Sequence, residues 1–217
     1  MTATRRISVG QLAIAVAAMA IVVVASNFLV QFPVPGSLGP VSLTDLLTFG
    51  AFTYPAAFLV TDLTNRRFGP AAARRVVVAG FVLAVALSVW LATPRIAIAS
   101  GTAFLVAQML DVTVFDRLRR AAWWKAPFVS SLLGSVIDTL LFFSLAFSAA
   151  AAGVLGFDDA FAVEAAPLLG AFAPEVPRWI SWALGDFCVK ILVATALLAP
   201  YRVLLAVVRS MPEKAPA

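Results

Sequence analysis

Histidine does not occur among the 217 residues of this chain, and charged side chains are scarce. Without histidine the chain can build neither an imidazole metal site, nor a Ser–His nucleophile, nor a histidine proton relay. A single cysteine, Cys188, excludes an internal disulfide framework and indicates no redox role. Only 12% of the residues are charged, against about 25% in a soluble domain, so charge cannot cover a water-facing surface.

The motifs of several enzyme classes are also missing. The sequence contains no G-x-x-x-x-G-K-[ST] phosphate loop, which argues against nucleotide hydrolysis of the P-loop type. Neither H-E-x-x-H nor G-x-S-x-G occurs. We therefore predict a protein that is not an enzyme and that holds no metal and no cofactor.

Long apolar runs dominate what is present. Hydrophobic residues make up 62% of the chain, in runs of a length that crosses a bilayer. We predict an all-α integral membrane protein, one membrane domain over 1–217, with six transmembrane helices at about 9–32, 42–65, 75–93, 96–118, 127–151 and 178–208. An outer loop at 152–178 and a disordered tail at 211–217 complete this prediction. The first run is longer than the apolar part of a signal peptide, so we expect it to stay uncleaved.

The stretch TYPAAFLVTDLTNRRFG at 53–69 interrupts the second predicted helix. Pro55 removes one backbone hydrogen bond and clashes with the carbonyl of Ala51, which predicts a kink. That kink could form a pocket wall or serve packing alone. Ser42 and Asp45 have the spacing of a capping box, which predicts the start of this helix and makes Asp45 a cap rather than a ligand contact.

Basic residues predict the orientation in the membrane. Because positive charge concentrates in cytoplasmic segments, both termini and the second and fourth loops are expected in the cytoplasm. Uneven clustering of the +5 net charge also argues against a nucleic-acid partner. The opposite segments hold only Arg95 and Arg178, and Lys190 lies within the last predicted helix. The segments expected in the cytoplasm hold the other basic residues, which are Arg5, Arg6, Arg66, Arg67, Arg74, Arg75, Arg117, Arg119, Arg120, Lys125, Arg202, Arg209 and Lys214.

Ionisable and amide side chains lie inside the predicted spans. They are Asn27, Asp62, Gln108, Asp111, Asp138, Asp186 and Lys190. An aspartate or lysine at a helix centre costs about 2.5–3.5 kcal/mol in lipid, so the four on the last three helices would together cost roughly 10–14 kcal/mol. That sum rivals the stability of a whole protein. These groups must therefore face the bundle interior or water.

Helical spacing places the polar groups on three stripes, one on each of the last three helices. At about 1.5 Å per residue, Asp138 and Lys190 reach similar depth near the midplane. We predict a pocket between these helices, offering carboxylates, an amide, one ammonium and aromatic faces. The stripes are Phe104, Gln108, Asp111 and Phe115; Ser131, Gly134, Ser135, Asp138 and Phe142; and Trp179, Trp182, Asp186 and Lys190.

Purely structural roles are open for the same residues. Asp186 and Lys190, four positions apart, can form an intrahelical pair. Asp138 can join helices through neighbouring serines, and Asp111 can pair with Arg117. Near the cytoplasmic end of the second helix we expect a structural clasp to the third helix, made by Asp62, Arg66, Gly69 and Arg74 with Asn65.

Five segments carry a resemblance to a known family. They are SNFLVQFP, TYPAAFLVTDLTNRRFGPAAARR, IASGTAFLVAQMLDVTVFDRLR, WWKAPFVSSLLGSVIDTLLFFSLAF and ALGDFCVKILVATALLAPY. The chain resembles the queuosine precursor transporter family, a branch of the vitamin uptake transporter group. The likeness covers five of the six predicted helices in matching order; the third helix and the 152–178 loop carry no signature. It implies import of 7-deazaguanine-type bases across the bacterial inner membrane, and a fold like the six-helix substrate-binding subunits of energy-coupling-factor transporters.

A 7-deazaguanine has a flat aromatic face and an edge of hydrogen-bond donors, which proteins read by stacking and by acceptors. Asp138 or Asp186 is expected to hold the donor edge, and Trp182 or Phe142 to stack on the ring. The full set of expected substrate contacts is Asp138, Asp186, Lys190, Gln108, Asp111, Trp182, Phe142, Asn27 and Tyr54.

Several alternatives to this function are open at the level of sequence. The chain could take up another vitamin-like heterocycle, or be a membrane subunit that needs an energising ATPase partner. Proton coupling through Asp138 or Asp186 is a further expectation. An intramembrane enzyme using only aspartates has no support in the sequence.

Overall fold

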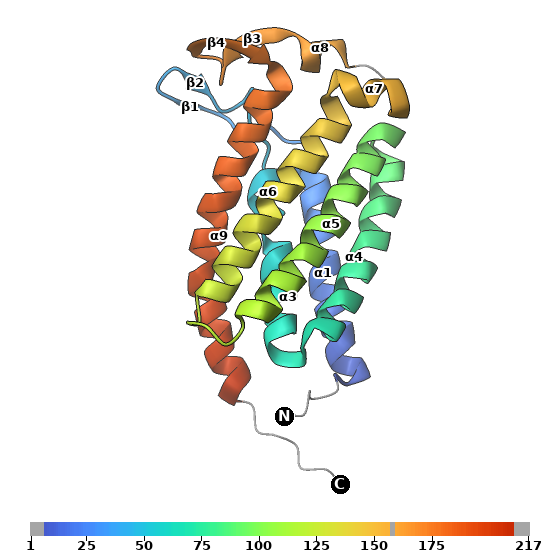
Figure 1. The fold of residues 1–217 in the computed structure, drawn as a ribbon, viewed down its shortest axis with the longest axis vertical. Helices are drawn as coiled ribbons and strands as arrows, with labels where there is room; N and C mark the ends of the chain where they lie inside the picture. Colours follow the sequence, from blue (N-terminus) through green and yellow to red (C-terminus); the bar gives the residue numbers. More distant parts are fainter. Residues whose placement is uncertain (1–6, 157–158, 211–217) are drawn as a thin grey trace.

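A computed structural model describes residues 7–156 and 159–210 as a bundle of long helices with two small hairpins at one end (Figure 1). The long elements are α1 (Val9–Leu29), α3 (Ala56–Phe68), α4 (Pro70–Leu91), α5 (Pro94–Leu118), α6 (Lys125–Phe147) and α9 (Arg178–Ser210). Shorter helices are α2 (Gly50–Thr53), α7 (Ala149–Leu155) and α8 (Ala160–Val163). Strands β1 (Ser37–Leu38) and β2 (Val41–Ser42) pair antiparallel, as do β3 (Ala165–Leu168) and β4 (Phe172–Pro177).

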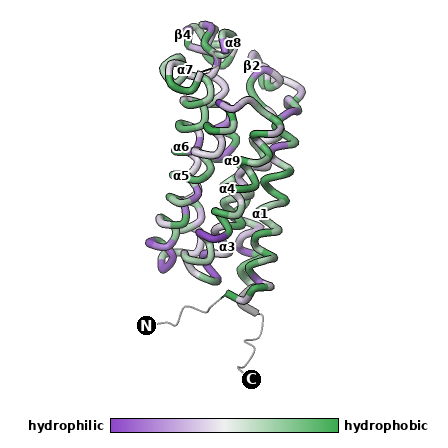
Figure 2. The backbone as a smooth tube through the Cα atoms, turned by 90° about the vertical axis from the view of Figure 1, so that its right-hand side faces the viewer, coloured by the Kyte–Doolittle hydropathy of each residue, from purple (hydrophilic) through white to green (hydrophobic). Residues whose placement is uncertain are grey.

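Five of these helices are long and apolar enough to cross a membrane within the described ranges: α1, α4, α5, α6 and most of α9. Large apolar side chains point away from the bundle, with Trp90 81% exposed and Leu192 68% exposed. Figure 2 shows hydrophobic backbone along the length of the bundle and more hydrophilic segments toward its ends. The prediction of an all-α, multi-pass membrane protein is confirmed at this level.

The second predicted helix is wrong in its first part. Residues 42–49 are not helical, because the proline- and glycine-rich segment before them closes into the β1–β2 hairpin, with Gly39 at φ 58°. The backbone N–H of Leu43 bonds back to the carbonyl of Gly36 at 3.0 Å. Asp45 therefore caps no helix; it is exposed, and α2 starts five residues later at Gly50.

The break expected at Pro55 is present. α2 ends at Thr53, and α3 begins at Ala56 on the other side of Pro55. α3 ends at Gly69, whose φ of 86° is in the region that favours glycine, and Pro70 then occupies the first turn of α4. This turn explains why the third long helix begins at Pro70 and not at 75.

Other predicted boundaries also shift. α1 ends at Leu29, and the fifth long helix ends at Phe147, where Ser148 caps the separate helix α7 through the N–H of Ala151. The 152–178 connection is not an irregular loop: it contains α8 and the β3–β4 hairpin. The tail at 211–217, expected to be disordered, lies outside the described residues.

Helix α5 packs against α3, α4 and α6, and its outer side, with Ile98 and Val106, is exposed. Met19, Val76, Val77 and Phe104 form the main apolar core among α1, α4 and α5. We call the end with the β-strands the hairpin end; the α3–α4 and α5–α6 turns lie at the opposite end, where α1 begins and α9 finishes (Figure 1). The second end is called the basic end, since the arginine-rich turns lie there.

Candidate functional site

A cavity of about 460 Å³ lies in the hairpin-end half of the bundle, within the range of small-molecule sites. Helices α1, α4, α5, α6 and α9 line it, together with the segment leading into α2. The lining includes Gln31, Leu91, Ile96 and Phe147, which lie near the hairpin-end termini of their helices. The cavity thus reaches from the middle of the bundle to the hairpin end.

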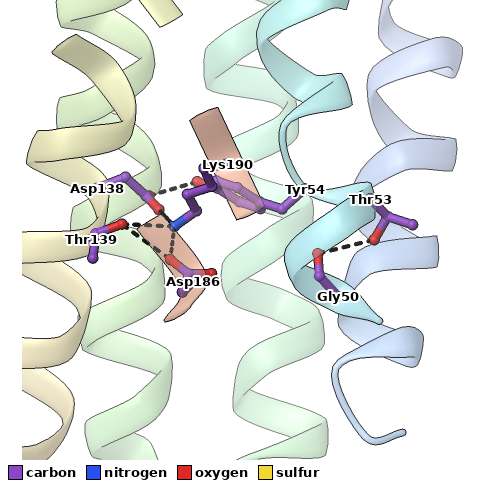
Figure 3. A network of polar contacts seen from close by, with 7 residues as sticks. All are labelled: Gly50, Thr53, Tyr54, Asp138, Thr139, Asp186 and Lys190. Atoms are coloured by element: carbon purple, nitrogen blue, oxygen red, sulfur yellow. Dashed lines mark hydrogen bonds and ion pairs between the residues drawn. The ribbon is translucent and has the colours of Figure 1, made fainter. Parts of the chain in front are cut away.

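A polar network forms one part of the cavity wall, around Lys190 (Figure 3). The Nζ atom of Lys190 lies 2.6 Å from Oδ2 of Asp138 on α6 and 2.5 Å from Oδ2 of Asp186 on its own helix. It also donates to Oγ1 of Thr139 at 3.1 Å, and Thr139 donates in turn to Asp186 at 3.0 Å. The hydroxyl of Tyr54 donates to Oδ1 of Asp138 at 2.8 Å. Three separate segments of the chain are tied together at one point.

The two carboxylates of this network are not equivalent. Asp138 is 3% exposed, and both of its oxygens are engaged, one by Tyr54 and one by Lys190. Asp186 has a side chain that is 15% exposed, and only its Oδ2 accepts bonds from residues in the described part of the chain. Two carboxylates share one ammonium, so the network has an excess of acceptors on the cavity side. Asp186 is the group with free acceptor capacity.

Aromatic rings form another part of the wall. Phe142 and Phe147 lie with their centroids 6.0 Å apart, and Phe147 meets Trp182 edge-on at 5.4 Å and 78°. All three line the cavity, as does Tyr54, whose ring lies 5.3 Å from Nζ of Lys190. The arrangement places apolar ring faces and edges beside a carboxylate, which suits a flat polar ring better than an aliphatic chain.

A smaller polar group lies on the α1, α4 and α5 side of the cavity. Ser88 bonds Oδ1 of Asn27 at 3.4 Å and lies 3.0 Å from the hydroxyl of Ser100. The amide nitrogen of Asn27 donates to the carbonyl of Val23 within α1 at 2.9 Å. Ser26 also lines the cavity, and its buried hydroxyl has no hydrogen-bond partner among the described residues. These hydroxyls and the amide add donors and acceptors opposite the carboxylates.

Seven of the nine residues expected to contact substrate line the cavity; they are Asn27, Tyr54, Asp138, Phe142, Trp182, Asp186 and Lys190. The other two, Gln108 and Asp111, do not. Gln108 faces α3, where it accepts a bond from Thr61 at 2.7 Å, and both side chains are 0% exposed. The reason is that Gln108 and Asp111 lie further from the hairpin end of α5 than the cavity residues Ser100 and Ala103, at a level where α5 packs against α3.

The structure also shows which of the contacts expected for purely structural roles are formed. The intrahelical pair of Asp186 and Lys190 exists, but Asp138 joins it from α6, so the pair is part of an interhelical network. Asp138 bonds Tyr54 and Lys190 rather than the serines of its own helix. Arg117 forms no ion pair with Asp111 in the described ranges: both oxygens of Asp111 lack hydrogen-bond partners.

Of the expected clasp residues, Arg66, Gly69 and Arg74 lie at the basic end, whereas Asp62 lies further into the bundle and accepts a bond from Ser130 on α6. The contacts join other helices than predicted. Arg66 donates to the hydroxyl of Tyr201 on α9 at 2.9 Å and to the carbonyl of Arg119 after α5. The guanidinium of Arg119 donates in turn to the backbone carbonyls of Asn65 and Arg66, in the last part of α3. Gly69 acts through its turn conformation, and Arg74 is exposed, outside this cluster. α3 is therefore tied to α5 and α9 at this end, not to α4 through Arg74.

Sequence reasoning missed Thr139, Phe147, Ser88 and Ser100, and it set Asp45 aside as a helix cap although this residue lines the cavity. Thr139 follows Asp138 directly, so a wider stripe on α6 would have included it. Phe147 lies nine residues after Asp138, on the opposite side of an ideal helix, so the stripe gives no signal for it. Ser88 lies on the third predicted helix, which offered no charged residue as a signal. Serines are common in membrane helices and give little warning of a site.

Comparison with known proteins places the chain in a family. The family model described as "Putative vitamin uptake transporter" matches residues 48–93 and 87–204. The chain is 37% identical over 207 residues to a protein of Escherichia coli (strain K12) named "Queuosine precursor transporter", covering 85% of this chain and 82% of that protein. It is 34% identical over 215 residues to a protein of Haemophilus influenzae named "Probable queuosine precursor transporter", covering 86% and 83%.

A relative of the same name in Bacillus subtilis is 28% identical over 128 residues, 46% of this chain and 56% of that protein. No solved structure matches the chain. The relatives are named as transporters and not as enzymes, in keeping with the motifs that the sequence lacks. The matched residues include the α3, α5, α6 and α9 segments that build the polar network and its surroundings. The chain belongs to the vitamin uptake transporter family and, within it, to the queuosine precursor transporters.

Proposed function

We propose that this protein imports queuosine precursors, 7-deazaguanine-type bases used in tRNA modification, across the bacterial inner membrane. Family membership supports the reaction class, because the relatives with the highest coverage carry that name. The observation that carries the proposal is the cavity beside Asp186, in which a carboxylate with free acceptor capacity adjoins aromatic rings. The bilayer and one small heteroaromatic base are the partners required.

The cavity chemistry matches the edge of such a base. A 7-deazaguanine donates from a ring N–H and an exocyclic amine, and Oδ1 of Asp186 is a carboxylate acceptor in the cavity that no described residue uses. Asp138 is already satisfied by Tyr54 and Lys190, so its role is to hold the ammonium in place. Trp182 and Phe142 supply ring surface for the flat face of the base.

The proposed topology has six spans, with α2 and α3 counted as one span broken at Pro55. The two pieces together run from Gly50 to Phe68, which is 19 residues when the break is included, about the length a span requires. The basic turns after α3 and α5 lie at the end of the bundle where α1 begins and α9 finishes, and the positive-inside bias supports a cytoplasmic position for this end and for both termini. The cavity then faces the outside, as an importer requires before uptake. We propose the substrate-binding subunits of energy-coupling-factor transporters as the nearest fold type.

Complementation tests the proposed function. A bacterial strain that cannot make the precursor and lacks its own transporter would receive this gene, with the base supplied at limiting concentration. We expect queuosine in its tRNA to be restored by the wild-type protein and by the Glu175→Gln variant, whose exposed side chain lies on β4. Asp186→Asn should restore little, at equal protein level in the membrane. Normal queuosine with Asp186→Asn, or none with the wild type, would contradict the proposal.

A further inference from the structure

A second pair of buried carboxyl groups lies deeper in the bundle, between the cavity and the basic end. Asp62 on α3 is 2% exposed and Asp111 on α5 is 0% exposed. On α3, the amide nitrogen of Asn65 donates to the carbonyl of Val112, the neighbour of Asp111 on α5, at 2.9 Å, so the two carboxyl-bearing segments face each other. Ser130 on α6 donates to Oδ1 of Asp62 at 3.4 Å. Neither carboxyl lines the substrate cavity.

The polar atoms around Asp111 are unusually poorly satisfied. Both of its carboxyl oxygens are buried without a hydrogen-bond partner among the described residues, and so are the amide nitrogen of Gln108 and the amide oxygen of Asn65. Gln108 lies one turn from Asp111 on α5, and Asn65 lies one turn from Asp62 on α3. An ionised carboxylate in such a place is strongly disfavoured, and two side by side still more so. One bound proton removes most of this cost.

The charged groups that face the pair leave it with excess negative charge. Arg66 is the cation near Asp62, but its Nε donates to the hydroxyl of Tyr201 and its NH1 to the carbonyl of Arg119. The guanidinium of Arg66 also lies over the ring of Phe115, 4.9 Å from its centroid. On the α5 side, Arg119 is paired with Asp116 at 3.0 Å. One arginine thus balances only one of the two buried carboxyl groups.

A small void lies beside Asp62, one member of the pair. It has a volume of about 10 Å³ and is lined by Asp62, Pro55, Ser131 and Tyr201, among other residues of α6 and α9. That is about the space of one water, which could carry a proton between the carboxyl pair and the basic end. The same helix break also joins this pair to the cavity, since Tyr54 on one side of Pro55 bonds Asp138 and α3 on the other side carries Asp62.

We propose that Asp62 and Asp111 share one proton at a site separate from the substrate cavity, and that filling and emptying this site drives base uptake. The coupling rests on the proposed transport function; the proton site does not. In loading, a hydronium ion outside gives its proton to a carboxylate oxygen of the pair and leaves a water. In release, the carboxylic O–H bond breaks and the proton passes to a cytoplasmic water. Asp138 and Asp186, which share Lys190, then serve binding and not coupling.

Infrared spectroscopy of the purified protein tests the proton site without any substrate. We expect a carboxylic-acid carbonyl band at neutral pH that shifts in deuterated water, changes frequency in Asp62→Asn and in Asp111→Asn, and disappears when both residues are asparagine. Glu175→Gln and Asp138→Asn should retain the wild-type band. Persistence of the band in the double variant, an unchanged band in both single variants, or absence of the band from the wild type would overturn the proposal.

Proton movement in proteoliposomes tests the coupling. With a pH-sensitive dye inside the vesicles, adding a 7-deazaguanine base should carry protons inward with the wild type and with Glu175→Gln. Asp111→Asn should bind the base with an affinity within about twofold of wild type, as expected for a change away from the cavity, but should move no protons with it. Asp62→Asn serves as the second variant should Asp111→Asn fold poorly.

The outcomes separate the two proposals. Base transport by the wild type without proton entry, or transport driven instead by a sodium gradient, would overturn the proton coupling. Retained proton entry in both asparagine variants, with loss in Asp186→Asn, would overturn it in favour of the cavity carboxylates. A wild type that neither binds nor transports the base refutes the proposed function, while the infrared band still decides the proton site.

Discussion

Replacing Lys190 by methionine removes the cation that lies between Asp138 and Asp186. Its Nζ atom is within 2.6 Å and 2.5 Å of their carboxylate oxygens, and the residue is 3% exposed. Removing one partner of a buried ion pair costs about 3–5 kcal/mol, because the remaining charge stays buried without compensation. The side chain of Asp186 is 15% exposed to the cavity, so water there can partly solvate it. We therefore expect Lys190→Met to lower the free energy of unfolding by about 3 kcal/mol, the lower end of that range.

Reversible unfolding in detergent micelles measures this loss, and a second substitution tests its cause. Adding Asp186→Asn to Lys190→Met removes one of the two uncompensated charges, so the double variant should be more stable than the single one by about 1 kcal/mol or more. Lys125→Met, at an exposed lysine at the start of α6, should cost less than about 1 kcal/mol. A Lys190→Met protein as stable as wild type, or a double variant less stable than the single, would refute this reasoning.

Three further substitutions test other parts of the structure. Tyr54→Phe keeps the ring but removes the 2.8 Å bond to a buried carboxylate, so unfolding in the same assay should become easier by about 1.5–3 kcal/mol; no change would contradict that role. Gly134→Ala places a Cβ 2.7 Å from a ring atom of Phe58, which should cost about 1–3 kcal/mol, whereas Gly153→Ala meets no atom within 4 Å and should cost nothing. Trp182→Ala should weaken base binding by about 1–3 kcal/mol in a titration if the ring stacks on the base, and unchanged affinity would exclude stacking.

Much of the polar network could be predicted, because its geometry follows from the rise per residue of a helix and from the free-energy cost of a charged side chain in lipid. Asp138 and Lys190 were expected at similar depth, and they meet at 2.6 Å. Aspartates and a lysine inside apolar helices must find one another or a cavity, so the choice of partners is small. Tyr54 was expected to contact substrate, but its bond to Asp138 was not predicted, because that bond depends on how far α2 and α3 bend, which the sequence does not state.

The failures have equally specific causes. The Ser42 and Asp45 spacing is a local signal for a helix start, but the chain before it is held in a hairpin and continues as turns to Gly50. The stripe on α5 gives the face that carries Gln108 and Asp111, but not which neighbour that face meets. Because α5 contacts α3, α4 and α6, the same stripe can serve a cavity at one level and a helix contact at the next. Rotation and depth of packed neighbours are tertiary properties.

The affinity of purified protein for a 7-deazaguanine base, and for the analogue without the exocyclic amine, tests the central claim most directly. With wild type, the analogue should bind more weakly, because it lacks the exocyclic amine and offers Asp186 only the ring N–H. Asp186→Asn should weaken binding of the parent base by about 1.5–3 kcal/mol, roughly ten- to a hundredfold, and should change the affinity for the analogue much less. Equal loss for both ligands, or no loss for either, would contradict the assignment of Asp186 to the donor edge of the base.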